Sequence, residues 1–323
     1  MRARRRLGEF HDDTYFGSPF PGTLTHLIDA GNLKYIMADS TGPTVWKFRR
    51  NFRHILWIGD VIMIIDDVKS YQAGQFQRLL HVGEKATVKD ADMHVAGPHG
   101  EVLVRPLFPA ELPPGLPADF PEGMRIVEES GFKDHDIKHH DTYYSFEPPH
   151  KTDQTTFVVA LILKGPARQE PSVERFQSEN MEGIRITQAG TVTEVYVNTL
   201  AEGRIRHRNA IVEAKGWDTD AYLTALTFPQ DADRTKAQNI SGLFAADGSF
   251  LRRNGVVVYD SLSKVFMNAS YSPGKLDVSL QGQPDINLSL LPGRGKEEVT
   301  VNGKRNLDSE VLKNGLIRVS QQR

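Results

Sequence analysis

Three stretches near the start of the chain decide the fold prediction: THLIDAGNLKYIMAD (residues 25–39), FRHILWIGDVIMIIDDVKS (residues 52–70) and FQRLLH (residues 76–81). The middle stretch is rich in Val and Ile, and it is interrupted by Gly59-Asp60. β-Branched residues favour strands, and a Gly-Asp pair between two such runs favours a tight turn. The pattern therefore predicts a β-hairpin with strands at Ile55–Ile58 and Val61–Asp66.

Short β-rich runs of the same kind continue to the end of the chain, separated by Gly, Pro, Asn and Asp. Three dipeptides, Asp247-Gly248, Asn254-Gly255 and Asn302-Gly303, are typical of tight turns that need positive φ. We therefore predict an all-β protein, a large antiparallel two-sheet β-sandwich with few short helices. The predicted parts are an N-terminal arm (1–20), a first half of the sandwich (21–165) and a second half (166–323).

Helical patterns are scarce in this sequence. Ser172–Glu182 and Asp231–Asn239 could each form two or three helical turns. The segment Pro106–Gly123 carries six prolines, which remove backbone donors and clash with a preceding helical turn. We expect this segment to be a long surface loop.

Composition excludes several classes of protein. The 323 residues carry a formal net charge of −2, are 39% hydrophobic and include no cysteine. Disulfides and thiolate metal sites are therefore excluded. The longest apolar run falls far short of the roughly 20 residues of a membrane-spanning helix, so no membrane partner is expected. The basic start, MRARRRLGEF, leads into no apolar signal-peptide core and predicts an exposed arm and no nucleic-acid partner. The compartment stays open.

A histidine, an aspartate and a second histidine lie at or beside the ends of apolar runs: His26, Asp39 and His81. Two imidazoles and one carboxylate form a common zinc ligand set that leaves a fourth position for water or a substrate oxygen. The trio is thus a candidate metal site. The alternative places each residue at a strand end, with its polar tip in water or hydrogen-bonded to the backbone.

Basic and aromatic residues alternate between Trp46 and His54. Arginine matches carboxylates and sulfates, and an indole face stacks on sugar rings. The candidate substrate-binding residues are Trp46, Arg49, Arg50 and Arg53. The alternative is that Phe48 and Phe52 pack inward while the arginines are solvated. Arg53, which directly precedes a core strand, is also the best candidate for an internal ion pair.

Two further groups of polar residues have simpler interpretations. The segment DHDIKHHD (residues 134–141) contains three histidines; we expect a solvated loop, and a metal site is the alternative. Tyr143 and Tyr144 are expected to be strand residues. Asp66 and Asp67 are adjacent in a strand and so point to opposite faces. We expect one to be exposed and the other to cap the turn toward Lys69.

The order of several short motifs resembles one known family. These are Thr25-His26, Ala38-Asp39, Arg53-His54-Ile55-Leu56, Ile64-Ile65-Asp66-Asp67-Val68 and Arg78-Leu79-Leu80-His81. Over about residues 20–90 the chain resembles the C-terminal β-sandwich module of heparinase II/III-like polysaccharide lyases. Such enzymes join this module to an α-helical toroid and cleave uronic-acid polysaccharides by β-elimination. Several bind zinc in the β-module, and most are periplasmic or extracellular.

The chain departs from the family pattern in two respects. A chain of this length has no room for the toroid, which supplies most catalytic residues. Family members also carry a tyrosine shortly after the metal aspartate, whereas STGPTVWKFRRNFRH (residues 40–54) contains none. The resemblance therefore implies a β-sandwich with a structural zinc ion and an acidic polysaccharide partner, but no complete lyase active site.

The sequence supports three hypotheses about function. The first is the β-sandwich portion of a lyase whose catalysis is completed by a separate α-helical toroid. The second is a non-catalytic carbohydrate-binding or scaffold protein. The third is an all-β hydrolase that uses carboxylates not identified in the sequence. The catalytic residues are left open.

Overall fold

The computed structural model describes most of the chain. The described residues are 22–82, 86–109, 124–133, 136–148, 150–165, 169–178, 180–202, 209–281, 288–291, 298–306 and 310–319. Two compact units share these residues: unit 1 comprises Met1–Leu27 and Tyr35–Arg168, and unit 2 comprises Ile28–Lys34 and Gln169–Arg323. The predicted N-terminal arm lies outside the described residues.

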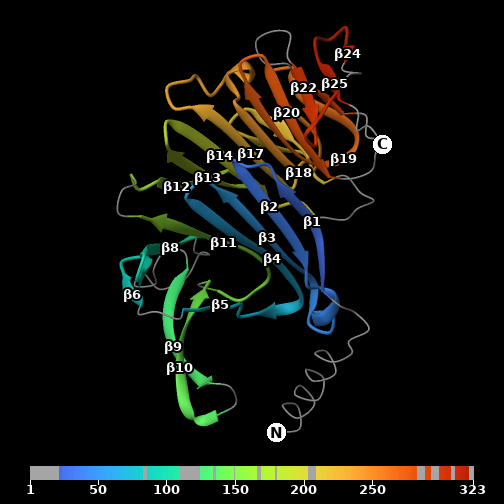
Figure 1. Ribbon diagram of the computed structural model, residues 1–323. Helices are drawn as coiled ribbons and strands as arrows, with labels where there is room; N and C mark the ends of the chain where they lie inside the picture. Colours follow the sequence, from blue (N-terminus) through green and yellow to red (C-terminus); the bar gives the residue numbers. More distant parts are fainter. Residues whose placement is uncertain are drawn as a thin grey trace. The chain divides into compact units, whose positions relative to one another are not determined.

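An eight-stranded sheet is the main element of unit 1 (Figure 1). Its strand order is β1-β2-β3-β4-β11-β8-β7-β6. The bounds are β1 (Thr23–Asp29), β2 (Leu33–Asp39), β3 (Phe48–Ile58), β4 (Val61–Gly74), β6 (Ala86–Lys89), β7 (Asp92–Gly97), β8 (Gly100–Phe108) and β11 (Thr152–Lys164), with the 3-10 turn η1 (Gly42–Thr44) between β2 and β3.

The central hairpin of this sheet, β3–β4, is the one that the sequence predicts. Ile58 pairs with Val61 across the turn, and Gly59 adopts a φ of 57° there. Both strands extend well beyond the predicted bounds. Directly opposite residues lie on the same face, so the pairing of Arg53 with Asp66 places a base beside an acid.

A three-stranded sheet, ordered β5-β10-β9, is the second element of unit 1. Its strands are β5 (Arg78–His81), β9 (Arg125–Lys133) and β10 (Asp136–Glu147), and β9 and β10 form the green hairpin in Figure 1. Tyr144 and Phe146 of β10 share a buried cluster with Phe157 and Val159 of β11. The two sheets of unit 1 therefore pack through an apolar core.

Unit 2 contains a single branched sheet. Its main path runs β12-β13-β14-β17-β18-β19-β20-β22-β23, with β15–β16 and β21–β25–β24 attached at β18 and β19. All pairings along it are antiparallel except β20 with β22. The strands are β12 (Ser172–Ser178), β13 (Met181–Gln188), β14 (Thr191–Asn198), β15 (Val212–Ala214), β16 (Trp217–Thr219), β17 (Leu223–Pro229), β18 (Gly242–Arg253), β19 (Val256–Ser272), β20 (Lys275–Gln281), β21 (Leu288–Leu290), β22 (Glu298–Val301), β23 (Lys304–Arg305), β24 (Glu310–Val311) and β25 (Ile317–Val319).

The core of unit 2 brings the main path and its branches together. Trp217 from the β15–β16 branch is buried with Leu226 and Leu243 of the main path, and Ile317 of β25 belongs to the same cluster. Each of these side chains leaves at most 4% of its surface exposed. Burial on this scale stabilises each side chain by ~1.5–3 kcal/mol relative to exposure.

The all-β prediction is confirmed, and neither of the two segments that could form helical turns is an α-helix. Ser172–Glu182 forms strand β12 and the start of β13, which pair from Ser172 with Thr187 to Ser178 with Met181. Asp231–Asn239 consists of turns and one 3-10 turn, η2 (Ala237–Asn239). Pairing within a hairpin of consecutive strands has overridden a weak helical preference in the first case. No helix among the described residues is long and apolar enough to cross a membrane.

Two of the three predicted turn dipeptides are confirmed. Asn254-Gly255 joins β18 to β19 and Asn302-Gly303 joins β22 to β23, with positive φ at all four residues. Asp247-Gly248 instead lies inside β18, where the register with β19 shifts on both sides of Gly248. It is a β-bulge, which uses positive φ for the same steric reason as a turn.

Two expected loops are partly or wholly strand. Pro106 belongs to β8, which continues to Phe108, and residues 110–123 lie outside the described ones. Residues 136–141 form the first half of β10, so the expected solvated loop is wrong there. Tyr143 and Tyr144 are strand residues, as predicted.

Candidate functional site

The end of β4 and the turn before β3 enclose a surface groove in unit 1. Its volume is about 630 Å³. The lining residues are Trp46, Lys47, Phe48, Ser70, Tyr71, Gln72, Ala73, Gly74, Gln75, Phe76, Gln77 and Leu79. β4 is buried or partly buried up to Ser70 and exposed from Tyr71 to Ala73, so the strand leaves the core where the groove begins.

Two aromatic side chains are exposed in the groove. Trp46 is 51% exposed and Tyr71 is 50% exposed. Beneath them, Phe48 and Phe76 stack with ring centroids 6.2 Å apart. Because large aromatic faces are usually buried, two exposed ones in a single hollow indicate a binding surface.

Cationic and amide groups surround these rings. The guanidinium of Arg49 lies 5.1 Å from the centroid of Tyr71, and the Nζ atom of Lys47 lies 5.8 Å from that of Phe48. The side-chain amides of Gln75 and Gln77 donate to the carbonyl of Pro148 (2.8 Å) and to Oε1 of Glu147 (2.6 Å). Aromatic faces beside fixed amides and cations can hold a polar ring and a negative charge together.

Two aspartates, Asp66 and Asp67, and three arginines form ion pairs between the strands around the groove. Asp66 accepts from Nε of Arg53 at 2.5 Å and from Nε of Arg78, on β5, at 3.0 Å. Arg50 and Asp67 form a second pair, in which Nη2 of Arg50 donates to Oδ1 of Asp67 at 2.9 Å and Nε lies 2.7 Å from Oδ2. Arg50, Asp66, Asp67 and Arg78 are buried. The predicted internal ion pair of Arg53 is therefore confirmed. The expectation that one aspartate is exposed and the other caps a turn is wrong, because both are buried acceptors for arginines.

The four predicted substrate-binding residues thus lie in different settings. Trp46 lines the groove, and Arg49 covers the ring of Tyr71. Arg50 is only 7% exposed and is committed to Asp67, and Arg53 is half exposed and committed to Asp66. Binding by these residues stays a prediction, and the geometry favours Trp46 and Arg49.

Sequence reasoning missed the groove wall formed by the end of β4 and the residues after it. Tyr71, Gln72, Gln75 and Gln77 fall within YQAGQFQ (residues 71–77). The available signal was the loss of apolar residues at the end of a long Val/Ile strand, with three glutamines in seven positions. Without the register of β4 this change looks like an ordinary loop.

The predicted metal trio is spread over two sheets. His26 lies on β1 and Asp39 at the end of β2, where its Oδ1 accepts from the N–H of Thr41 at 2.8 Å. His81 is exposed on β5 and stacks on Tyr143, with centroids 5.3 Å apart. No three His, Asp or Glu side chains within the described ranges are placed to hold a metal ion. The trio does not fit a shared zinc site, and zinc binding stays a prediction.

Among the described histidines, His54 is the one whose pKa is shifted most by its surroundings. His54, on β3, is 1% exposed, and its Nδ1 lies 2.8 Å from the hydroxyl of Tyr35, which is completely buried. Burial lowers the pKa of His54 to about 3; the charge of Asp66 opposes this shift, and those of His26 and Arg50 add to it. His54 is therefore neutral at physiological pH and structural in role.

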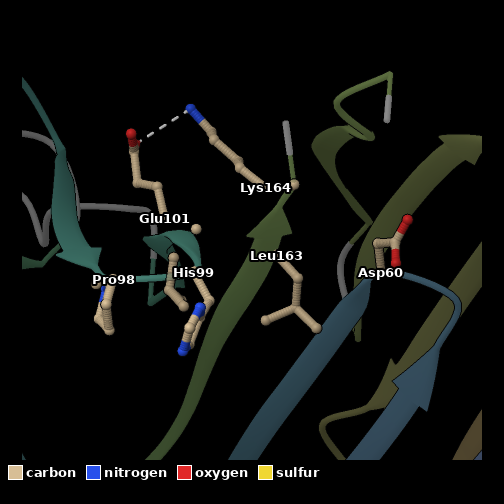
Figure 2. Close-up of a pocket in the computed structure, with 10 residues that line it drawn as sticks. Asp60, Pro98, His99, Glu101, Leu163 and Lys164 are labelled. Carbon is tan, nitrogen blue, oxygen red and sulfur yellow. Dashed lines mark ion pairs between the residues drawn. The ribbon is translucent and has the colours of Figure 1, made fainter. Parts of the chain in front are cut away.

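A second hollow lies at the C-terminal end of β11 and has a volume of about 370 Å³ (Figure 2). The β7–β8 turn with Pro98 and His99, the turn residue Asp60, and Leu163 line it. Glu101 is held by Nδ1 of His94 at 2.6 Å and by Nζ of Lys164 at 3.5 Å. The hydrogen bond from His94 is the main cause that lowers the pKa of Glu101. The described residues that line this hollow include no Phe, Tyr or Trp, so the groove at Trp46 is the stronger candidate.

The sequence matches no family model and no curated protein. Solved structures give a distant match. The heparan sulfate lyase HepC from Pedobacter heparinus is 14% identical, with a TM-score of 0.40, over 55% of this chain and 28% of the lyase. A mutant of the same enzyme is 13% identical with the same score and coverage. A heparinase III is 12% identical, with a TM-score of 0.39, over 55% of this chain and 27% of that one. The matched part is thus little more than a quarter of each lyase.

Proposed function

We propose that unit 1 is a carbohydrate-binding β-sandwich module whose groove receives an acidic polysaccharide. The observation that carries this proposal is the pair of half-exposed aromatic faces, Trp46 and Tyr71, beside the cations Lys47 and Arg49. The rings supply apolar faces for sugar rings, and the cations supply charge for uronate or sulfate groups. The buried pairs of Asp66 and Asp67 hold this surface rigid, which reduces the entropy lost on binding.

The motifs shared with heparinase II/III-like lyases support a more specific role. In this role unit 1 forms one wall of a polysaccharide cleft, and a helical module supplies the residues for β-elimination. That reaction needs a base for the C5 proton, a group that neutralises the uronate and an acid for the leaving oxygen. Lys47 and Arg49 are suited to neutralise the uronate. In place of the family tyrosine after Asp39, Trp46 offers a stacking face and no proton.

Binding tests the proposal directly. Isothermal titration calorimetry with heparan sulfate, alginate and hyaluronan should detect at least one ligand. Trp46→Ala and Tyr71→Ala should each weaken its binding about 5- to 30-fold, because each removes a stacking face worth ~1–2 kcal/mol. Trp57→Ala is the matched control, since Trp57 is 41% exposed on β3 but does not line the groove. Absence of binding to all three polymers, or an equal loss in Trp57→Ala, would refute the groove.

A non-catalytic carbohydrate-binding or scaffold role is the alternative, favoured by the missing tyrosine. Absorbance of unsaturated uronide products separates the two roles. We expect none from this chain alone. Addition of a heparinase-type helical module should give product if unit 1 is a lyase wall and none if it only binds. Product formed by this chain alone would contradict the prediction that its active site is incomplete.

A further inference from the structure

Unit 2 holds a group of cations around a single carboxylate, Glu194 of β14. The carboxylate is 3% exposed and is fully engaged. Its Oε1 accepts from Nη2 of Arg185 at 3.0 Å and lies 3.4 Å from Nε of Arg234, and its Oε2 accepts from the hydroxyl of Tyr196 at 2.7 Å. Glu194 therefore already binds two guanidinium groups and a phenol.

A third cation, Lys215, lies beside this group. Its Nζ is 3.9 Å from the ring centroid of Phe176, and the guanidinium of Arg185 is 5.7 Å from the same centroid. Lys215 forms no ion pair with any carboxylate that the structure describes. Its pKa is lowered by partial burial and by the charges of Arg185 and Arg234, while Glu194 opposes this shift. The ammonium thus has a ring and like charges as neighbours.

The fold holds these cations in place from separate elements. Arg185 comes from β13, Arg234 from the segment between β17 and β18, and Lys215 from the β15–β16 turn. Lys215 and Gly216 have φ values of 50° and 86°, and Glu213 accepts from the N–H of Gly216. Phe176 lies over Gly183, where a Cβ would come within 2.0 Å of its ring. A positive-φ turn and a glycine beneath the ring therefore set the position of the ammonium.

The positive and negative charges around Lys215 and Glu194 are unbalanced. Four cations, with Arg253 beside Gly216 as the fourth, lie around three acids: Glu194, Glu213 and the exposed Glu174, whose Oε2 lies 3.7 Å from Nη1 of Arg185. The cations in excess of these acids repel one another, and a further anion bound among them would relieve that repulsion. We propose that Lys215, together with Arg234, binds an oxyanion group, a carboxylate or a sulfate, of an acidic ligand. This site shares no residue with the groove in unit 1.

Tryptophan indole signals in the NMR spectrum can test the site. The chain has three tryptophans. Trp217 lies two residues after Lys215 and reports on this site, whereas Trp46 reports on the groove. Sodium sulfate and a galacturonate oligosaccharide, which carries only carboxylates, should each shift the Trp217 signal saturably. A neutral oligosaccharide should leave it unchanged. Saturation by one probe alone would identify the preferred oxyanion and still support the site.

Variants of Lys215 separate charge from structure. Lys215→Gln should weaken binding of the effective probe about tenfold or more, and Lys215→Arg should restore it, because the loss is that of a charge-assisted contact. Lys236→Gln is the matched control, since Lys236 is exposed in the same unit and pairs with Asp233. The inference is overturned if neither probe shifts the Trp217 signal or if Lys215→Gln binds as wild type does.

Discussion

Individual residues in unit 1 show how charge is placed inside an apolar sheet. Asp66 serves Arg53 on its own sheet and Arg78 on the other, so one buried carboxylate links two layers. The hydrogen bond to Asp66 raises the pKa of Arg53, while burial lowers that of Arg78. His54 instead stays neutral, because a charged imidazole at this buried position would have no solvent around it.

Asp66→Asn should destabilise unit 1 strongly. The substitution keeps the shape but leaves the guanidinium of Arg78, only 4% exposed, without its counter-charge. Breaking a buried pair in this way costs ~3–5 kcal/mol. Urea unfolding measures the change. Glu101→Gln, in a half-exposed cluster of the same unit, should move the midpoint far less because water screens its ion pairs. Equal shifts in the two variants would contradict the linking role of Asp66.

The stability of unit 1 should fall as pH drops below about 6.5, in part because of His54. The unfolded histidine takes up a proton near its usual pKa of 6.5, whereas the folded one resists until about pH 3. The contribution is therefore complete above pH 6.5, is lost progressively toward pH 3, and is on the order of 5 kcal/mol at most.

Urea midpoints between pH 4 and pH 7 test this dependence on His54. His54→Leu should flatten the pH dependence, although it lowers stability throughout because Tyr35 loses its partner. His99→Gln, at an exposed turn position, should keep the wild-type slope. An unchanged slope in His54→Leu would show that other groups cause the acid sensitivity.

At the level of secondary-structure elements, strand pairing and close backbone approach determine which conformation a segment adopts. β12 has a sequence that permits a helix, yet it pairs with β13 along its whole length. In β18, Asp247-Gly248 forms a bulge, and a Cβ on Gly248 would lie 2.4 Å from that of Ala221. Glycine is required there by the neighbouring segment as much as by the local backbone.

The β7–β8 hairpin offers a matched pair of glycines. Gly97 and Gly100 are register partners, but a Cβ on Gly100 would lie 2.7 Å from the carbonyl oxygen of Lys164, whereas one on Gly97 meets only an ordinary contact at 3.6 Å. Gly100→Ala should therefore push β8 from β11 and cost ~1–3 kcal/mol. Gly97→Ala should be near neutral. Thermal unfolding compares the two, and similar midpoints would contradict the close approach of β8 to β11.

For the molecule as a whole, charge gives no general attraction for a polyanion. The net charge is −2 and the sequence pI is about 6.6. Binding of an acidic glycan must then depend on local cations held by the fold, and the structure provides them in each unit. Such contacts are short-range and are screened by salt.

A salt series should therefore distinguish ionic contacts from aromatic stacking in the groove. Between 50 and 500 mM NaCl, affinity for an acidic glycan should fall, because a few ion contacts are screened. Arg49→Ala should reduce this salt dependence. Trp46→Ala should lower affinity at every salt concentration and leave the dependence unchanged, since stacking carries no charge. Titrations in a salt series measure both slopes, and a wild-type slope in Arg49→Ala would exclude it from ligand binding.

The sequence alone determined the fold class, the β3–β4 hairpin and the internal pairing of Arg53, because alternation, turn chemistry and charge beside a core strand are local properties. It also singled out Trp46 and Arg49, whose role in binding stays a prediction. The tertiary structure decided what depends on register between distant strands: the burial of Asp66 and Asp67, the separation of His26, Asp39 and His81, and the groove wall at Tyr71. It alone brought Arg185, Lys215 and Arg234 together around Glu194, since these residues are up to 49 positions apart (234 − 185) and meet only through the folding of the sheet.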